Sequence, residues 1–377
     1  MTSTTQSSAV VERASTLELF LDLVFVFTVT QFTRVIVAAH APEDYLKAAL
    51  VFMTLWWIYS GYVWLTSNVG TDGTRHRLLM FTGMAGFLLM ALAIPDVFGA
   101  SGLVYGAGLL LVTLVHAGLF RSATTGSAQA ILGIAPFNLA AALLVLIAGL
   151  VPEPWDWPLW ILAVLTVMGS SVLRRESGFT LSPAHFVERH GLVVIVALGE
   201  SVVSIGIGAR ERALDWTVLA PAVLGLALAA ALWWTYFDQD DARAEQAMQA
   251  LPDRARARAA LLAFGYGHFL MLSGIIVLSA GIKGVVAHPL GHAPAHDPWH
   301  LGLGLSVYLL GDGLYRGLLG LGALRPRLLT AGLTALTVPL GQHLGGLWQL
   351  AACVALLVGL LVLERRASRP LHDVSPA

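Results

Sequence analysis

The sequence predicts an all-α integral membrane protein with a bundle of about twelve transmembrane helices, and three observations carry this prediction. Residues of the AVILMFWYC set make up 57% of the 377 residues, and the mean hydropathy is +0.75. Charged residues make up 12%, against roughly 25% in soluble domains. The apolar residues also gather into stretches of about 20, the length that crosses a bilayer as a helix. A water-soluble globular protein and a disordered chain are therefore excluded.

Twelve apolar stretches follow one another with short connections. They lie at 17–39, 45–66, 77–97, 101–120, 128–150, 155–173, 184–208, 216–237, 257–284, 299–320, 327–345 and 346–364. Helices of about 21 residues at these positions leave about 125 residues for loops and tails, which is too few for an extramembrane domain. Pro339 and Gly341 interrupt the eleventh stretch, and the sixth begins among prolines.

The ends of the chain and its charged loops predict the topology. Residues 1–16 are polar without a basic segment, so they are a tail and no cleavable signal peptide. Fifteen arginines, Arg325 and Arg327 among them, fall on one side of the spans, and four Lys or Arg residues fall on the other. Loops rich in Lys and Arg stay in the cytoplasm. We therefore expect an even number of spans, with the 1–16 tail, the 174–183 linker and the 365–377 tail all cytoplasmic.

Short matches suggest that the chain contains a duplication. Residues 55–59 and 232–236 share the pattern L-W-W-x-Y, 177 residues apart, and residues 87–90 resemble 268–271, 181 residues on. In a third match, the segment that begins with Glu18 aligns with the segment that begins with Glu188. These matches predict two six-helix halves, 17–173 and 184–364, as parallel repeats whose interface could hold a substrate site. The alternative is a duplication that builds only a symmetric scaffold.

Two charged motifs resemble those of a known family. Residues 17–26, LELFLDLVFV, resemble the L-E-L-F-F-D-L-V-F-V signature of the bacterial low temperature requirement protein A family, with Leu21 where that family often has Phe. Residues 185–192, HFVERHGL, and the following ALGES at 197–201 resemble its second motif. The resemblance implies a multi-pass protein of the bacterial inner membrane. It names no reaction and no substrate.

The first motif places two carboxylates inside a span. Glu18 and Asp22 are four residues apart and share one helix face. Two carboxylates so placed require a proton or a nearby cation. They could form a cation or proton site, or they could pair with Arg189 or Arg316 as a structural lock.

The second motif adds His185, Glu188, Arg189 and His190, and Glu200 lies about three turns beyond Arg189. Glu200 at that depth suits a proton-coupled carboxylate, and the alternative is a neutral residue in an interhelical hydrogen bond. His185 and Glu188 could also join the carboxylates of the first motif in a metal site for Fe, Mn or Zn.

Two further groups of residues complete the candidates. Asp312 and Arg316 are one turn apart and are expected to pair within their helix. The external loop 288–300 carries four histidines at intervals of four residues, which could bind Zn or Cu weakly: His288, His292, His296 and His300. Cys353 is the single cysteine, which excludes a disulfide within the chain and a cysteine-built metal site.

Three functions compete on this basis. The first is a transporter-like protein that binds or moves a small solute or ion, with Glu18, Asp22, Glu188 and Glu200 as coupling groups. The second is a structural or sensory membrane protein that supports growth in the cold. The third is a membrane-embedded enzyme acting on a lipid-soluble substrate. A net charge of −1 argues against a nucleic-acid partner, the bilayer is the expected environment, and no cofactor is indicated.

Overall fold

The computed structural model describes residues 14–68, 73–121, 127–173, 181–210, 212–289 and 294–367. The described residues form helices and contain no strand. The helices are α1 (Thr16–Ala38), α2 (Pro42–Thr66), α3 (Thr74–Ala93), η1 (Ile94–Asp96), α4 (Gly102–Phe120), α5 (Ser127–Ala148), α6 (Asp156–Leu173), α7 (Pro183–Gly208), α8 (Trp216–Phe237), α9 (Asp240–Ala250), α10 (Asp253–Ala259), η2 (Ala260–Gly267), α11 (His268–Ala287), α12 (Asp297–Leu319), α13 (Arg325–Ala335), α14 (Val338–Leu344) and α15 (Gly346–Ala367).

The helices follow the predicted spans closely, and α8 has the predicted bounds. Eight helical segments in the described part are long and apolar enough to cross a membrane, so a multi-pass membrane protein is confirmed while the count of twelve crossings stays a prediction. The eleventh span is divided into α13 and α14. Pro339 lies in the first turn of α14, where its missing N–H cannot continue the hydrogen bonding of α13.

Two features were not foreseen. The polar helix α9 follows α8 directly. It has no long apolar stretch, so the search for apolar spans in the sequence did not predict it. Within the ninth span, residues Ala260–Gly267 form a π-helix rather than an α-helix. Trp56 of α2 donates its indole N–H to the carbonyl of Gly265 in this segment at 2.7 Å. The wider turn is thereby tied to another part of the bundle.

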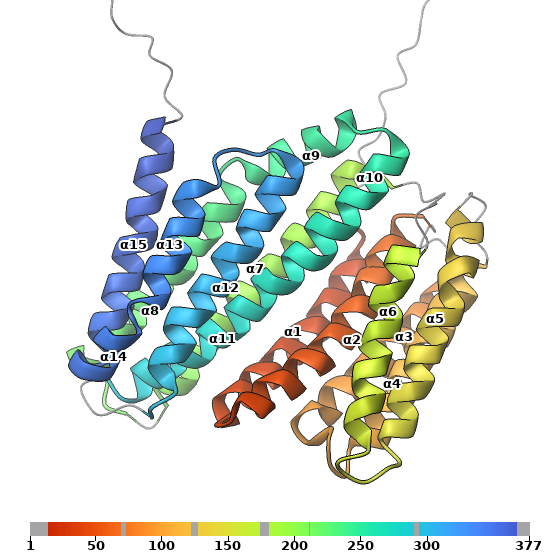
Figure 1. Cartoon of the computed structure of the whole chain (residues 1–377), viewed down its shortest axis with the longest axis horizontal. Helices are drawn as coiled ribbons and strands as arrows, with labels where there is room; N and C mark the ends of the chain where they lie inside the picture. The colour runs from red at the N-terminus through yellow and green to blue at the C-terminus, as the bar shows by residue number, and fades with distance from the viewer. Residues whose placement is uncertain are drawn as a thin grey trace, which may run out of the picture.

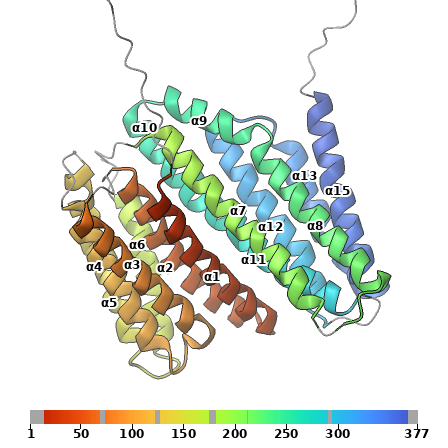
Figure 2. The ribbon, with the colours of Figure 1, turned by 180° about the vertical axis from the view of Figure 1, so that it is seen from behind.

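The helices form two groups that meet along α1 and α2. Figure 1 shows α1–α6 beside α7–α15, and Figure 2 shows the same arrangement from behind. Helix α1 packs against α7 and α11, and α2 also reaches both. In both views the start of α1 and the end of α15 lie at the same end of the bundle as α9 and α10.

Glycines allow α11 and α12 to pack with their backbones in contact. Gly267, Gly274 and Gly281 are spaced seven residues apart along the η2–α11 segment and face α12. A Cβ atom added at Gly274 would lie 2.4 Å from the backbone nitrogen of Tyr308. Small residues of this kind bring membrane helices close together, and this pair is a rigid centre of the second group.

We expect Gly274→Ala to lower the apparent melting temperature, because the added methyl group must push two backbones apart. Such overpacking costs about 1–3 kcal/mol. Gly206→Ala on α7 is the matched control, since its Cβ would meet nothing within 4 Å. Thermal unfolding in detergent, followed by tryptophan fluorescence, makes the comparison. Equal melting temperatures for the two variants would contradict the close packing.

Candidate functional site

The two motifs of the sequence meet at the junction of α1 and α7. Arg189 of α7 is fully buried and donates to both carboxylate oxygens of Asp22, at 2.6 and 2.8 Å. Tyr59 of α2 donates to the same carboxylate at 2.5 Å. The pairing with Arg189 is one of the two expected from the sequence, and Arg316 takes no part in it. Three helices are thereby joined by one charge-assisted cluster.

Glu18 has two roles in the same cluster. With Ser15 it forms a capping box at the start of α1: the N–H of Ser15 donates to Glu18 Oε2 at 2.7 Å, and the N–H of Glu18 donates to Ser15 Oγ at 3.4 Å. Its other oxygen lies 3.1 Å from Nε2 of His185 and 3.8 Å from Nε of Arg189. The pattern S-x-x-E at 15–18 could have revealed the cap.

Two residues of the second motif, Glu188 and His190, lie outside this cluster. Glu188 is exposed on α7 and accepts a hydrogen bond from the N–H of Ala14 at 3.3 Å. His190 is buried, its Nδ1 lies 2.9 Å from the carbonyl of Phe186, and its ring packs against Phe264 and His268. Among the described residues, Glu18, Asp22, His185 and Glu188 therefore do not gather as the metal site that the sequence left as one alternative.

Glu200 lies in a different environment. It is buried on α7, about 25 Å along the helix from Pro183. Thr30 of α1 donates to its carboxylate at 2.6 Å, and Ser204 one turn further donates at 3.4 Å. Within the described part of the chain, no Lys, Arg or His forms a salt bridge with Glu200. Among the described residues, the hydrogen bonds to its carboxylate come from hydroxyl groups.

A second ionic cluster lies among α9, α12, α13 and α15. Arg327 donates to both oxygens of Glu364 at 3.0 Å and also pairs with Asp312. Arg316 pairs with Asp240 at 2.6 Å. The expected Asp312–Arg316 pair within one helix is thus wrong, because each residue finds a partner on a neighbouring element. Three carboxylates and two guanidinium groups give this cluster a formal charge of −1.

Arg327 corrects a second expectation. The sequence placed it in a cytoplasmic loop, but its side chain is 2% exposed. It lies in the first turn of α13 behind Pro326, which brings it inside the bundle. The partners Asp240 and Glu364 were not among the predicted site residues, since each falls near the end of an apolar stretch where a charge is ordinarily solvated.

The comparison with known families bears on both motifs. The model of the bacterial low temperature requirement A protein (LtrA) matches residues 13–362, a range that includes the two motifs joined by Asp22 and Arg189. The chain belongs to the LtrA family. A relative is the uncharacterized protein RA0937 of Rhizobium meliloti (strain 1021), 29% identical over 295 residues, which cover 74% of this chain and 70% of the relative.

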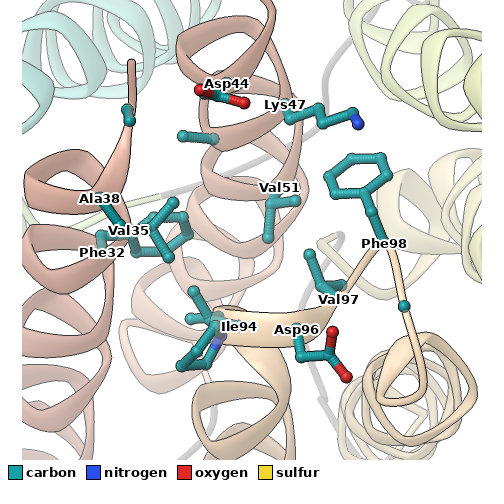
Figure 3. Close-up of a pocket in the computed structure, with 14 residues that line it drawn as sticks. Phe32, Val35, Ala38, Asp44, Lys47, Val51, Ile94, Asp96, Val97 and Phe98 are labelled. Atoms are coloured by element: carbon teal, nitrogen blue, oxygen red, sulfur yellow. The ribbon is translucent and has the colours of Figure 1, made fainter. Parts of the chain in front are cut away.

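The chain also contains a cavity of about 330 Å³ where α1 ends and α2 begins, at the end of the bundle opposite α9 and α10. Figure 3 shows Phe32 and Val35 of α1 on one side of it and Asp96 of η1 on another. Lys47 at its edge pairs with Glu43 and Glu153 at 3.0 and 2.8 Å. Glu200 does not line this cavity, so the cavity and the buried carboxylate are separate features.

The described histidines of the 288–300 loop do not all lie together. His288 is exposed, and His292 lies outside the described residues. His296 and His300 come together with Asp297, with ligand atoms within 4.8 Å of one another. Asp297 was not foreseen, although H-D-x-x-H places all three residues within one helical turn.

Proposed function

We propose that this LtrA-family protein is transporter-like and binds or moves a small solute or ion, with Glu200 as the group that takes up a proton or cation. One observation carries the proposal: Glu200 is buried at the α1–α7 junction with hydroxyl partners and no salt bridge among the described residues. An ionisable group inside a span is costly, and such groups commonly mark ion or proton pathways. Glu18 and Asp22 already share Arg189 and are less free to exchange a proton.

The arrangement supports the proposed topology of about twelve spans with both termini cytoplasmic in the bacterial plasma membrane. The start of α1 and the end of α15 lie at one end of the bundle in both views. The three arginines of α10 and those at the end of α15 belong to the same end: Arg254, Arg256, Arg258, Arg365 and Arg366. Such an excess of positive charge is typical of the cytoplasmic side.

Equivalent contacts support the proposed pair of six-helix repeats. In the first half, Thr54 and Tyr105 join their hydroxyls at 3.0 Å, and Tyr105 donates to the carbonyl three residues before Thr54 at 3.1 Å. In the second half, Thr235 and Tyr308 do the same at 2.9 and 3.2 Å. Helix α3 packs on α4 as α11 packs on α12. Parallel repeats often carry a site where they meet.

We expect Glu200→Gln to fold normally and to lose proton uptake, because glutamine keeps the size and the acceptor oxygen but cannot ionise. Protonation is read from the carboxyl band in infrared spectra recorded across pH in lipid. Uptake is read with a pH-sensitive dye inside proteoliposomes under an imposed membrane potential.

Glu188→Gln is the matched control, since Glu188 lies on the same helix and is exposed. It should retain both the infrared band and the uptake of the wild type. The proposal would be contradicted if Glu200→Gln showed the same pH-dependent infrared carboxyl band as the wild type, or the same proton uptake.

The closed ionic clusters favour a second function, a structural membrane protein that supports growth in the cold. Arg189 and Arg327 each form salt bridges with two or more carboxylates, as interhelical locks would. Normal growth in the cold with Glu200→Gln would favour this function over transport.

A further inference from the structure

His296, Asp297 and His300 surround one point at the start of α12. Nε2 of His296 and Nδ1 of His300 each lie 3.7 Å from Oδ1 of Asp297. This separation is too long for a hydrogen bond. It is close to the edge of a tetrahedron, about 3.3 Å, formed by ligands at 2.0–2.1 Å from a zinc ion. The three atoms are spaced as if to share a partner.

The second observation concerns the ring of His300, which is 2% exposed. Its Nδ1 is buried and has no hydrogen-bond partner among the described residues, a costly state for a polar atom. Its Nε2 lies 2.8 Å from the hydroxyl of Tyr45 on α2. Tyr45 donates its own proton to the carbonyl of Ala39 at 3.4 Å. With its own proton directed to Ala39, the Tyr45 hydroxyl can accept from Nε2–H of His300, and in that tautomer Nδ1, 3.7 Å from Oδ1 of Asp297, carries the lone pair.

The carboxylate of Asp297 is held in place by the shape of α11. A Cβ at Gly284 would lie 2.2 Å from Oδ2 of Asp297, so the side chain occupies the space that only glycine leaves. The His40 ring, from the turn between α1 and α2, packs against His296 with centroids 5.0 Å apart. Ligands from the start of α12 are thus supported by residues of both helix groups.

We propose that His296, Asp297 and His300 form a binding site for a divalent transition-metal ion, with zinc as the best match. Two imidazoles and a carboxylate suit zinc, cobalt or nickel and disfavour magnesium and calcium, which prefer oxygen ligands. Three protein ligands leave a fourth position for water or for His40. Tyr45 and Gly284 are positioning residues that orient the ligands.

The ion would tie the two helix groups together at the end away from α9 and α10. Tyr45 lies on α2 and His40 between α1 and α2, whereas Asp297 and His300 belong to α12 and His296 directly precedes it. Metal occupancy should therefore raise the apparent melting temperature of the full chain, since a ligand that binds only the folded state stabilises it.

The test uses full-length protein purified in detergent with a tag that lacks histidine and stripped with a chelator. Zinc binding is measured by equilibrium dialysis, and the visible spectrum of added cobalt reports tetrahedral coordination. We expect one zinc ion per chain in the wild type. Binding should be lost in Asp297→Asn and His300→Ala, and Tyr45→Phe should bind about 10–100-fold more weakly.

The controls separate this site from unspecific capture. His288→Ala removes an exposed histidine beside the same loop and should bind zinc as the wild type does. Gly284→Ala keeps every ligand but displaces Asp297, so it should bind zinc more weakly. This variant therefore tests the site independently of the ligand variants, in case one of those fails to fold. Equal binding in all variants, equal loss in His288→Ala, or the absence of saturable binding in the wild type would overturn the proposal.

Discussion

Arg189→Leu is expected to destabilise the fold strongly, because it leaves Asp22 and Glu18 buried beside each other without their guanidinium. Removing one partner of a buried ion pair costs about 3–5 kcal/mol. Asp22 loses both donors from Arg189 and keeps only the hydroxyl of Tyr59. We expect a large fall in the apparent melting temperature and a smaller monodisperse fraction in size-exclusion chromatography.

Arg34→Leu is the control for this change, since Arg34 lies on α1 but is exposed. Its melting temperature should stay near that of the wild type. The double variant Asp22→Leu with Arg189→Leu should recover part of the loss, because apolar replacement of a whole buried pair is often neutral. A double variant as unstable as Arg189→Leu would mean that the guanidinium is needed for something other than charge neutralisation.

Arg327→Leu is expected to have an effect at least as large. The cluster would keep three carboxylates, those of Asp240, Asp312 and Glu364, with Arg316 as the remaining cation. The expected loss is again about 3–5 kcal/mol, measured by thermal unfolding in detergent. Arg327→Lys should fall between, because an ammonium keeps the charge but cannot form the bidentate contact with Glu364.

Arg325→Leu provides the matched control two residues away. Arg325 is exposed at the start of the same helix, so its loss should change the melting temperature little. If Arg325→Leu and Arg327→Leu melted alike, the buried cluster would not be the source of the stability.

Apolar length was sufficient to find the long apolar helices of this chain. A span of about 20 apolar residues leaves the backbone no alternative to a helix in a bilayer, so the predicted bounds of α8 agree with the structure. Helix α9 and the π-helical segment were missed for opposite reasons. The first has no apolar stretch, and the second has one, but apolarity does not distinguish a π-helix from an α-helix.

The candidate site was predicted residue by residue but not pair by pair. The motifs named Asp22 and Arg189, which do meet, whereas helical spacing paired Asp312 with Arg316, which take other partners. Helical spacing tells which residues share a face. It does not tell which neighbouring helix brings a stronger partner, so Asp240, Glu364 and the burial of Arg327 depend on tertiary packing.

The polar contacts of α1 and α2 with the second helix group have a mechanical consequence. They are spread along the junction: His185 with Glu18 near one end, Thr30 with Glu200 further along, and Tyr45 with His300 at the other. The α11–α12 pair, by contrast, is locked by backbone contact. Hydrogen bonds can exchange one partner for another, whereas interlocked backbones cannot. The seam beside α1 therefore depends on individual polar contacts and on the Arg189–Asp22 ion pair, whereas α11 and α12 are fixed to each other by their backbones.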